Sequence, residues 1–244
     1  AAPIVLARAA SPALAQETEQ TPAIPTLPPW WSTGAELILE LSSVTDGGVS
    51  RGTSSRSLVA LTGALALAAA LGAAGAGAVE YTFLTAPPTN AGGALDVGDV
   101  QIASNIESDV PLHHFQELWY TNGLGAGFSF ELGKLDANRR FAAPAAAGGF
   151  AHSSAGFAPT ILGMPSYPDP AAGLTLHHAA ELASGGRTRF SYGLFDGALG
   201  VDGVRTGRRG PSTLFRTERS DDLFHIAQAE YVAAGDGLRA VLGG

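Results

Sequence analysis

The sequence predicts an all-β protein built from antiparallel strands. Short runs alternate between apolar and polar residues with a period of two, the pattern of strands whose two faces meet different environments. Clusters of Gly, Pro, Asp and Asn separate these runs and are typical of turns. Charged residues make up only 15% of the 244 residues, whereas about a quarter is usual in soluble domains. These observations favour a β-structure with unusually little charged surface.

The alternation is clearest in residues 35–44, 127–133 and 188–195. In each of these segments Leu or aromatic residues occupy one face, while Glu, Ser or Arg occupy much of the other. Weaker strand candidates are residues 114–120, 174–177, 222–231 and 238–242. Together with two strands expected from residues 57–79, about nine strands are predicted.

The polarity of the two strand faces predicts a transmembrane β-barrel. A soluble sandwich buries its apolar face, whereas an outer-membrane barrel turns that face to lipid and lines water with its polar face. The chain contains a single lysine, Lys134, and its low charge content favours the barrel. Four aromatic residues near predicted strand ends suit interface girdles, namely Trp30, Trp31, Tyr120 and Tyr231, and Trp119 suits either a girdle or a core position.

Composition also argues against several classes of function. A net charge of −8 with scattered arginines does not provide the clustered basic face that nucleic-acid binding requires. The chain has no cysteine, Ser153 and Ser154 lie in no G-x-S-x-G motif, and Asp169 between two prolines is typical of a turn. A glycosidase pair of Asp169 with Asp196 is therefore disfavoured. We expect a protein that is not an enzyme and has no cofactor.

The uncharged residues 57–79 allow two interpretations. About 20 apolar residues can span a bilayer as a helix. However, Gly72, Gly75 and Gly77 weaken a helix, and leucines at 65, 67 and 71 alternate with Ala and Gly as a barrel strand would. So apolar a helix would also be retained in the inner membrane. We therefore expect two strands here.

The first 29 residues are expected to precede the barrel. Residues 13–15 before Gln16 match the A-x-A pattern of a signal peptidase site, and the apolar residues 4–6 suit a signal-peptide remnant over residues 1–15. An Ala-rich disordered tail is the alternative. Residues 16–29 are rich in proline and predict an unstructured leader, which leaves 30–244 for the barrel.

Five segments carry a resemblance to a known family. In chain order they are SNIES (104–108), ELWY (117–120), LGKLDANRRFA (132–142), SSAGFAPT (153–160) and SYPDPAAG (166–173). Their order and spacing resemble those of the carbohydrate-selective porins of Gram-negative outer membranes. This resemblance extends over residues 51–195 and implies a sixteen-stranded barrel through which sugars diffuse passively into the periplasm.

The resemblance also implies partners. Mono- or oligosaccharides would be the ligands, outer-membrane lipid would surround the protein, and the barrel-assembly machinery would insert it; homo-oligomers remain open. The chain ends in GLRAVLGG within a predicted strand, and about nine strands fall short of sixteen. We therefore expect an incomplete N-terminal portion of a barrel. The alternative function is a non-transporting envelope β-barrel, whether structural, an adhesin or a truncated remnant.

Residues 152–173 predict a long and apolar loop. Its four prolines disfavour both helix and central strand. Loops of about 20 residues without regular structure are usually functional or disordered. The family resemblance implies a constriction element folded into the barrel, and Phe157, Tyr167 and Asp169 are its candidate residues.

Polar residues on predicted strand faces are candidates for the pore wall. Glu131 and Arg189 lie on polar faces, and Arg187 shares the parity of Arg189. Opposite charges across a lumen would orient water and sugar hydroxyls, although solvated ion pairs away from a constriction fit the pattern equally well.

A second group of candidates follows the strand at 127–133 and contains Lys134, Asp136 and Asn138 with Arg139 and Arg140. These residues either reach into the channel or brace the loop. Bracing is slightly favoured, because Asp and Asn commonly satisfy the backbone of turns.

Two histidine pairs and one glycine-rich run suggest other sites. His113-His114 and His177-His178 each place adjacent side chains on opposite faces of a strand, so neither pair can hold one metal ion alone. We expect structural or pore-rim histidines and no metal site.

GLGAG at 123–127 resembles a phosphate-binding loop only superficially, because a strand follows it where a helix would be needed.

Overall fold

The computed structural model contains one antiparallel sheet and describes residues 5–8, 28–72, 75–89, 98, 104, 106–108, 110–142, 164–196, 223–233 and 239–243. Its strands are β1 (Val5–Arg8), β2 (Trp31–Val44), β3 (Gly52–Ala66), β4 (Ala78–Ala86), β5 (Leu112–Gly125), β6 (Phe128–Leu135), β7 (Ala171–Glu181), β8 (Arg187–Asp196), β9 (Leu223–Val232) and β10 (Arg239–Gly243). The predicted all-β, antiparallel class is confirmed.

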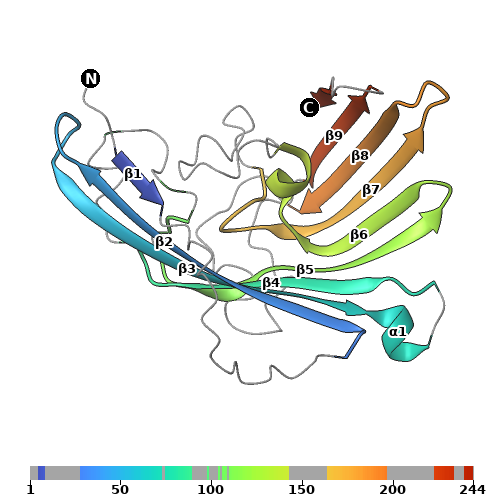
Figure 1. Ribbon diagram of the computed structural model, residues 1–244, viewed down its shortest axis with the longest axis horizontal. Helices are drawn as coiled ribbons and strands as arrows, with labels where there is room; N and C mark the ends of the chain where they lie inside the picture. Colours follow the sequence, from blue (N-terminus) through green and yellow to red (C-terminus); the bar gives the residue numbers. More distant parts are fainter. Residues whose placement is uncertain are drawn as a thin grey trace, which may run out of the picture.

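Each strand pairs with its neighbours in sequence, in the order β1 to β10. Within the described residues β1 and β10 are therefore the edges of an open sheet. Figure 1 shows the sheet curved into a trough, with β2 and β3 along one side and β7, β8 and β9 along the other. The short helix η1 (Asn138–Ala142) lies inside the trough and packs against β9. We call the face that η1 covers the inner face and the opposite one the outer face.

The outer face is apolar and exposed. Leu37, Leu39 and Leu41 of β2 are 61%, 51% and 54% exposed, while Glu40 and Ser42 on the inner face are buried. Later strands continue the exposed apolar set with Leu61, Phe128, Leu132, Leu176, Phe190, Leu223 and Tyr231. Strand periodicity thus separates the two kinds of residue as predicted for 35–44, 127–133 and 188–195.

From β4 onward, short and long connections alternate along the sheet. At one end Ala126 and Gly127 join β5 to β6, residues 182–186 join β7 to β8, and residues 233–238 join β9 to β10. At the opposite end β2 and β3 are joined by residues 45–51, while 25 residues separate β4 from β5, 35 separate β6 from β7 and 26 separate β8 from β9 in the sequence. Ala126 and Gly127 have φ values of 49° and 79°, the left-handed backbone that a two-residue hairpin requires. The GLGAG run is therefore a hairpin.

Residues 57–79 form parts of two strands and a short helix. β3 ends at Ala66, α1 (Leu67–Leu71) supplies little more than one turn, and β4 begins at Ala78. Among the described residues no helix is long and apolar enough to cross a membrane. The two-strand prediction is confirmed, but the strand pattern expected for 67–71 was wrong. Gly72 ends α1 with φ 66°, because a left-handed residue closes a helix readily when it has no Cβ.

The N-terminal residues differ from expectation at one point. Val5–Arg8, where the sequence suggested part of a signal-peptide remnant, forms β1 and pairs with residues 40–43 of β2. The remainder of 1–27 lies outside the described residues, so the signal-peptide and leader predictions have no further structural counterpart.

Two apolar clusters fill the inner face beneath the long connections. One joins Trp119 and Phe195 of the sheet to Phe141 of η1 and to Met164. The other contains Leu58, Leu84, Leu112 and Ile106, with Tyr167 packed against it.

Residues 164–170 therefore touch both clusters. This segment belongs to the predicted loop 152–173, of which residues 152–163 lie outside the described residues and 171–173 are part of β7.

Candidate functional site

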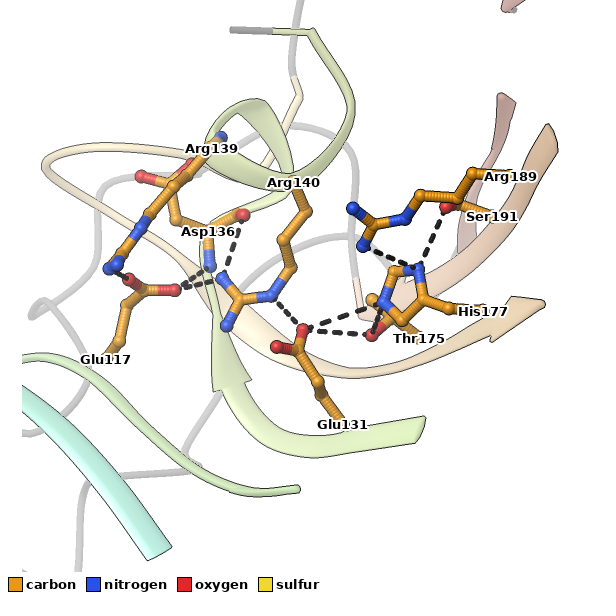
Figure 2. A network of polar contacts seen from close by, with 9 residues as sticks. All are labelled: Glu117, Glu131, Asp136, Arg139, Arg140, Thr175, His177, Arg189 and Ser191. Carbon is orange, nitrogen blue, oxygen red and sulfur yellow. Dashed lines mark hydrogen bonds and ion pairs between the residues drawn. The ribbon is translucent and has the colours of Figure 1, made fainter. Parts of the chain in front are cut away.

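A continuous network of polar side chains crosses the inner face from β5 to β8. It is drawn in Figure 2 and consists of Glu117, Glu131, Asp136, Arg139, Arg140, Thr175, His177, Arg189 and Ser191. Strands β5 to β8 supply six of these residues through their inward-facing positions, and the segment that follows β6 supplies three. We call this set the polar network.

Arg140 is the centre of the polar network. Its guanidinium donates to Glu117 of β5 through Nη1 and to Glu131 of β6 through Nε. The side chains of Arg140 and Glu117 are only 8% and 2% exposed. Removing charges from water is costly unless they are paired and hydrogen-bonded, and a guanidinium can serve two carboxylates at once. Arg140 therefore fixes η1 to two strands.

Trp119 lies beneath the two arginines of η1. The guanidinium carbons of Arg140 and Arg139 are 5.0 and 5.8 Å from the Trp119 ring centroid, within cation–π range. Trp119 itself is only 7% exposed and belongs to an apolar cluster. Of the two positions expected for this residue, the structure shows the core position. Arg139 also donates to Glu117, but 59% of its side chain is exposed.

The network continues from Glu131 to β8 through neutral hydrogen-bonding groups. The Thr175 hydroxyl donates to Glu131 at 3.1 Å, and His177 Nε2 lies 3.1 Å from the same hydroxyl oxygen. His177 Nδ1 lies 2.9 Å from Ser191 Oγ and 3.5 Å from Arg189 Nη2. Thr175, His177 and Ser191 are buried, whereas Arg189 is exposed. A row of hydrogen-bonding groups thus ends in an accessible cation.

Asp136 connects two segments that are far apart in sequence. Its Oδ1 accepts the backbone N–H of Arg139 at 3.0 Å, and its Oδ2 accepts that of Tyr167 at 2.9 Å. Burial, followed by the neighbouring negative charge of Glu117, raises the pKa of Asp136 to about 6, although the two N–H groups and Arg140 oppose this shift. The carboxyl braces the turn, as the Asp and Asn content of this run suggested.

Four of the five segments that carry the family resemblance meet on the inner face. Asp136 belongs to LGKLDANRRFA, Glu117 to ELWY and Tyr167 to SYPDPAAG. The Tyr167 hydroxyl donates to the carbonyl of Ile106 in SNIES at 3.1 Å. The fifth segment, 153–160, lies outside the described residues.

Residues 104–108 are themselves held on β2 and β3. Ser104 donates to Glu40, and Arg56 forms an ion pair with Glu107 at 2.9 Å. The side chain of Arg56 is 1% exposed and also donates to Ser42 at 2.8 Å. The inner face thus has a second buried charged group, which holds a long connection against the sheet.

Lys134 supports a distortion of the sheet. The register of β4 and β5 shifts between Thr82 and Phe83, which leaves Gln116 as an extra residue, a β-bulge. The Lys134 ammonium donates to the carbonyl of Phe115 beside this bulge at 2.6 Å. Lys134 is fully buried. The only lysine of the chain therefore lies within the protein, away from the open part of the inner face.

The remaining predicted residues occupy different places. Arg187 is exposed at the start of β8, and Asn138 begins η1. Asp169 is half-buried in the segment that precedes β7, and Phe157 lies outside the described residues. The polar network thus brings together five of the predicted residues, namely Glu131, Asp136, Arg139, Arg140 and Arg189.

The histidine pairs divide between the two faces. His114 and His177 are buried on the inner face, whereas His113 is exposed and His178 stacks near Phe128 on the outer face. Within the described residues no group of three or more His, Cys, Asp or Glu side chains is arranged to hold a metal ion.

Glu117, Thr175 and Ser191 were not predicted as site residues. The parity that placed Arg189 on the inner face also places Ser191 there, so this signal was present. Thr175 likewise shares its strand face with His177.

Comparison with known proteins adds no relative: no family model, curated protein or solved structure matches the chain.

Proposed function

We propose that the chain forms part of the wall of an outer-membrane porin, a β-barrel through which sugars diffuse passively into the periplasm. In this proposal the outer face contacts lipid, and the inner face borders a water-filled pore that the long connections narrow. The protein acts by restricting passage and not by catalysis.

The observation that carries this proposal is the polarity of the sheet, which is the reverse of that in a soluble protein: its apolar face is exposed and its polar face is covered. Large apolar side chains are exposed along the outer face of β2, β3 and β6 to β9, whereas charged and hydroxyl side chains are buried on the inner face. Lipid is the environment in which such an outer face is stable, and a polar interior is the usual lining of transmembrane barrels.

The connections support the same orientation. Bacterial outer-membrane barrels have short periplasmic turns and longer extracellular loops. The hairpins at 126–127 and 182–186 would then lie on the periplasmic side, and the ends of β4, β6 and β8 that lead into the long connections would lie on the outside. Within the connections 87–111 and 136–170, residues 104, 106–108 and 136–142 fold back over the inner face and would narrow the pore.

Sugar recognition would use the accessible end of the polar network. Passage through a pore requires weak, replaceable hydrogen bonds to sugar hydroxyls. Arg139 and Arg189 expose their guanidinium groups on the inner face, while Glu131 is partly exposed and holds its orientation through Arg140 and Thr175. Lys134 and Asp136 are buried, and their hydrogen bonds to the backbone would hold the segments beneath this surface in place.

A non-transporting envelope β-barrel is the second candidate. The observation that favours it is the open sheet, since a pore requires closure and the described strands leave β1 and β10 as edges. A structural barrel or an adhesin would keep the same inverted polarity without a sugar-dependent conductance.

Planar-bilayer conductance tests the proposal. The folded product of the full reading frame is added to the bilayer, and glucose and then maltose are titrated into the bath. Stepwise conductance that sugar blocks in a saturable manner is expected. The matched variants are Arg189→Gln, which should weaken the block, and Arg51→Gln in the exposed 45–51 turn, which should leave it unchanged. Absence of channels from protein with β-sheet circular dichroism would contradict transport and favour the second candidate.

A further inference from the structure

His177 lies where the neutral part of the polar network meets its accessible cation. Its ring is 8% exposed and lies between the hydroxyl groups of Thr175 and Ser191. Arg189 Nη2 also lies 3.5 Å from Nδ1 of the ring, as Figure 2 shows. The positions of the hydrogens on the two ring nitrogens therefore decide whether Arg189 is attracted or repelled.

The partners of the ring determine which nitrogen carries a hydrogen. The Thr175 hydroxyl donates its single hydrogen to Glu131, whose carboxylate is paired with Arg140. The Thr175 oxygen can then only accept from His177, so Nε2 carries a hydrogen. Arg189 has no acceptor atom, and its contact with Nδ1 therefore requires the lone pair of that nitrogen. The ring is consequently neutral, with its hydrogen on Nε2.

The other protonation states place like groups against each other. A ring with its hydrogen on Nδ1 alone would turn an N–H toward Arg189 and the lone pair of Nε2 toward Glu131 Oε2, 3.9 Å away. A ring with both hydrogens would be a cation 3.5 Å from the guanidinium, although Glu131 would attract it. Two further charges lie next to these partners: Arg140 of η1 is bonded to Glu131, and Glu230 of β9 is opposite Arg189 in register. Only the neutral Nε2–H form is compatible with Thr175, Glu131 and Arg189 together.

We propose that His177 is a positioning residue for sugar binding, which holds the Arg189 guanidinium through the lone pair of Nδ1. The guanidinium carries five N–H donors in one plane, so a bond through one of them fixes the direction of the others. Arg189 is exposed, and a side chain that is already held loses less conformational freedom when it binds a sugar hydroxyl. The role in sugar binding rests on the proposed function, whereas the contact between the two side chains does not.

Nitrogen NMR of the folded full-length protein with isotope-labelled histidine tests the contact itself. At neutral pH His177 should show a protonated Nε2 and an unprotonated Nδ1, and its signals are those that disappear in His177→Asn. Arg189→Met should shift the Nδ1 resonance, because methionine has no donor. Arg187→Met is the matched control and should leave that resonance in place, since Arg187 is also exposed on the inner face of β8 but lies opposite Glu181. A hydrogen on Nδ1, or equal shifts in the two arginine variants, would overturn the proposal.

Sugar block of the conductance tests the consequence of this contact. Asparagine and leucine have similar volumes, but only asparagine has an oxygen that can accept a hydrogen bond in place of Nδ1. His177→Leu should weaken the block by maltose about 3- to 10-fold, the usual contribution of one hydrogen bond, whereas His177→Asn should stay near the parent. Equal weakening in both variants would show a packing role and overturn the positioning role.

A double variant and the NMR result keep the outcomes distinct. When Arg189→Met is already present, His177→Leu should have no further effect on the block, because the two residues act through one contact. A full additional effect would contradict the positioning role. If His177→Leu does not fold, the comparison of Arg189→Met with Arg187→Met by NMR decides. A chain that forms no channel would contradict the proposed function but leave that NMR comparison intact.

Discussion

At the scale of single residues, the inner face is organised by buried charges that serve several partners each. Arg140 joins Glu117 to Glu131, Arg56 joins Ser42 to Glu107, and Lys134 satisfies a carbonyl beside a bulge. Burying such groups is unfavourable unless every charge is paired. Their arrangement therefore specifies which segment covers which strand.

Arg140→Gln should destabilise the fold strongly. The substitution leaves two carboxylates of the inner face without their common cation, and breaking a buried pair typically costs about 3–5 kcal/mol. Urea unfolding of the protein in detergent or vesicles would measure the free energy of unfolding. Arg51→Gln is the matched control, because its pair with Asp46 is exposed and should contribute about 1 kcal/mol or less. Equal effects of the two variants would refute a central role for Arg140.

Lys134→Met tests the support of the bulge. Methionine has a similar volume but cannot donate to the carbonyl of Phe115, and an unsatisfied buried carbonyl costs about 1–3 kcal/mol. The same unfolding experiment should show this loss. A neutral or stabilising effect would mean that the burial of the ammonium cancels the benefit of its bonds.

The sequence alone was sufficient to predict which face of a strand a residue occupies, but it was not sufficient to predict the partners of these buried charged residues. Period-two alternation placed Glu131 and Arg189 on the inner face, because neighbouring strand residues must point to opposite sides. The pairing of Glu117 with Arg140 depends on how the chain folds back after β6, which no local pattern encodes. The burial of Lys134 likewise depends on a bulge in a neighbouring strand.

At the scale of elements, η1 packs against the sheet at a glycine of β8, Gly193, where no side chain occupies the space. A Cβ at Gly193 of β8 would lie 2.7 Å from the ring of Phe141 and 2.6 Å from that of Phe195. Glycine at this position therefore leaves the space into which η1 inserts its phenylalanine. The short helix covers the inner face because of this local fit as well as its ion pairs.

Gly193→Val should displace η1 from the sheet. The added methyl groups would overlap the Phe141 ring, so the helix would have to move and Arg139 and Arg140 would become accessible. Limited trypsin digestion of the folded protein should then cut at these arginines faster than in the parent. Gly123→Val is the control, since nothing lies within 4 Å of its Cβ position. Equal cleavage rates in both variants would argue against this anchor.

At the scale of the whole molecule, polar and apolar side chains are divided between the two faces of one sheet. One sheet carries leucines and aromatic residues on its exposed outer face, and on the other face it buries charged side chains such as Glu40, Arg56 and Glu117. The alternation and low charge of the sequence predicted this distribution. The number of strands and the course of the long connections were less predictable, because strand ends and returns depend on tertiary packing.

Outer-face substitutions should act through the lipid. Leu176 lies opposite Phe130 and Tyr192 in the middle of β6 to β8. Leu176→Arg should lower the stability of the protein folded in vesicles by about 2–4 kcal/mol, the cost of arginine near the middle of a bilayer. Ser129→Arg, on the inner face of β6, is the matched control and should cost less. The reverse order would contradict a lipid-facing outer face.

The most direct test of the central claim is a cysteine scan along β6 and β7 of the protein folded in vesicles. The chain has no cysteine, so each variant carries a single labelled position. Fluorophores at Phe130, Leu132 and Leu176 should be quenched by lipid-attached quenchers, whereas one at Ser129 should be quenched by water-soluble iodide. This alternation with period two would establish one face in lipid and the other toward water. Iodide quenching of both sets, with no effect of the lipid quenchers, would contradict the membrane-barrel account.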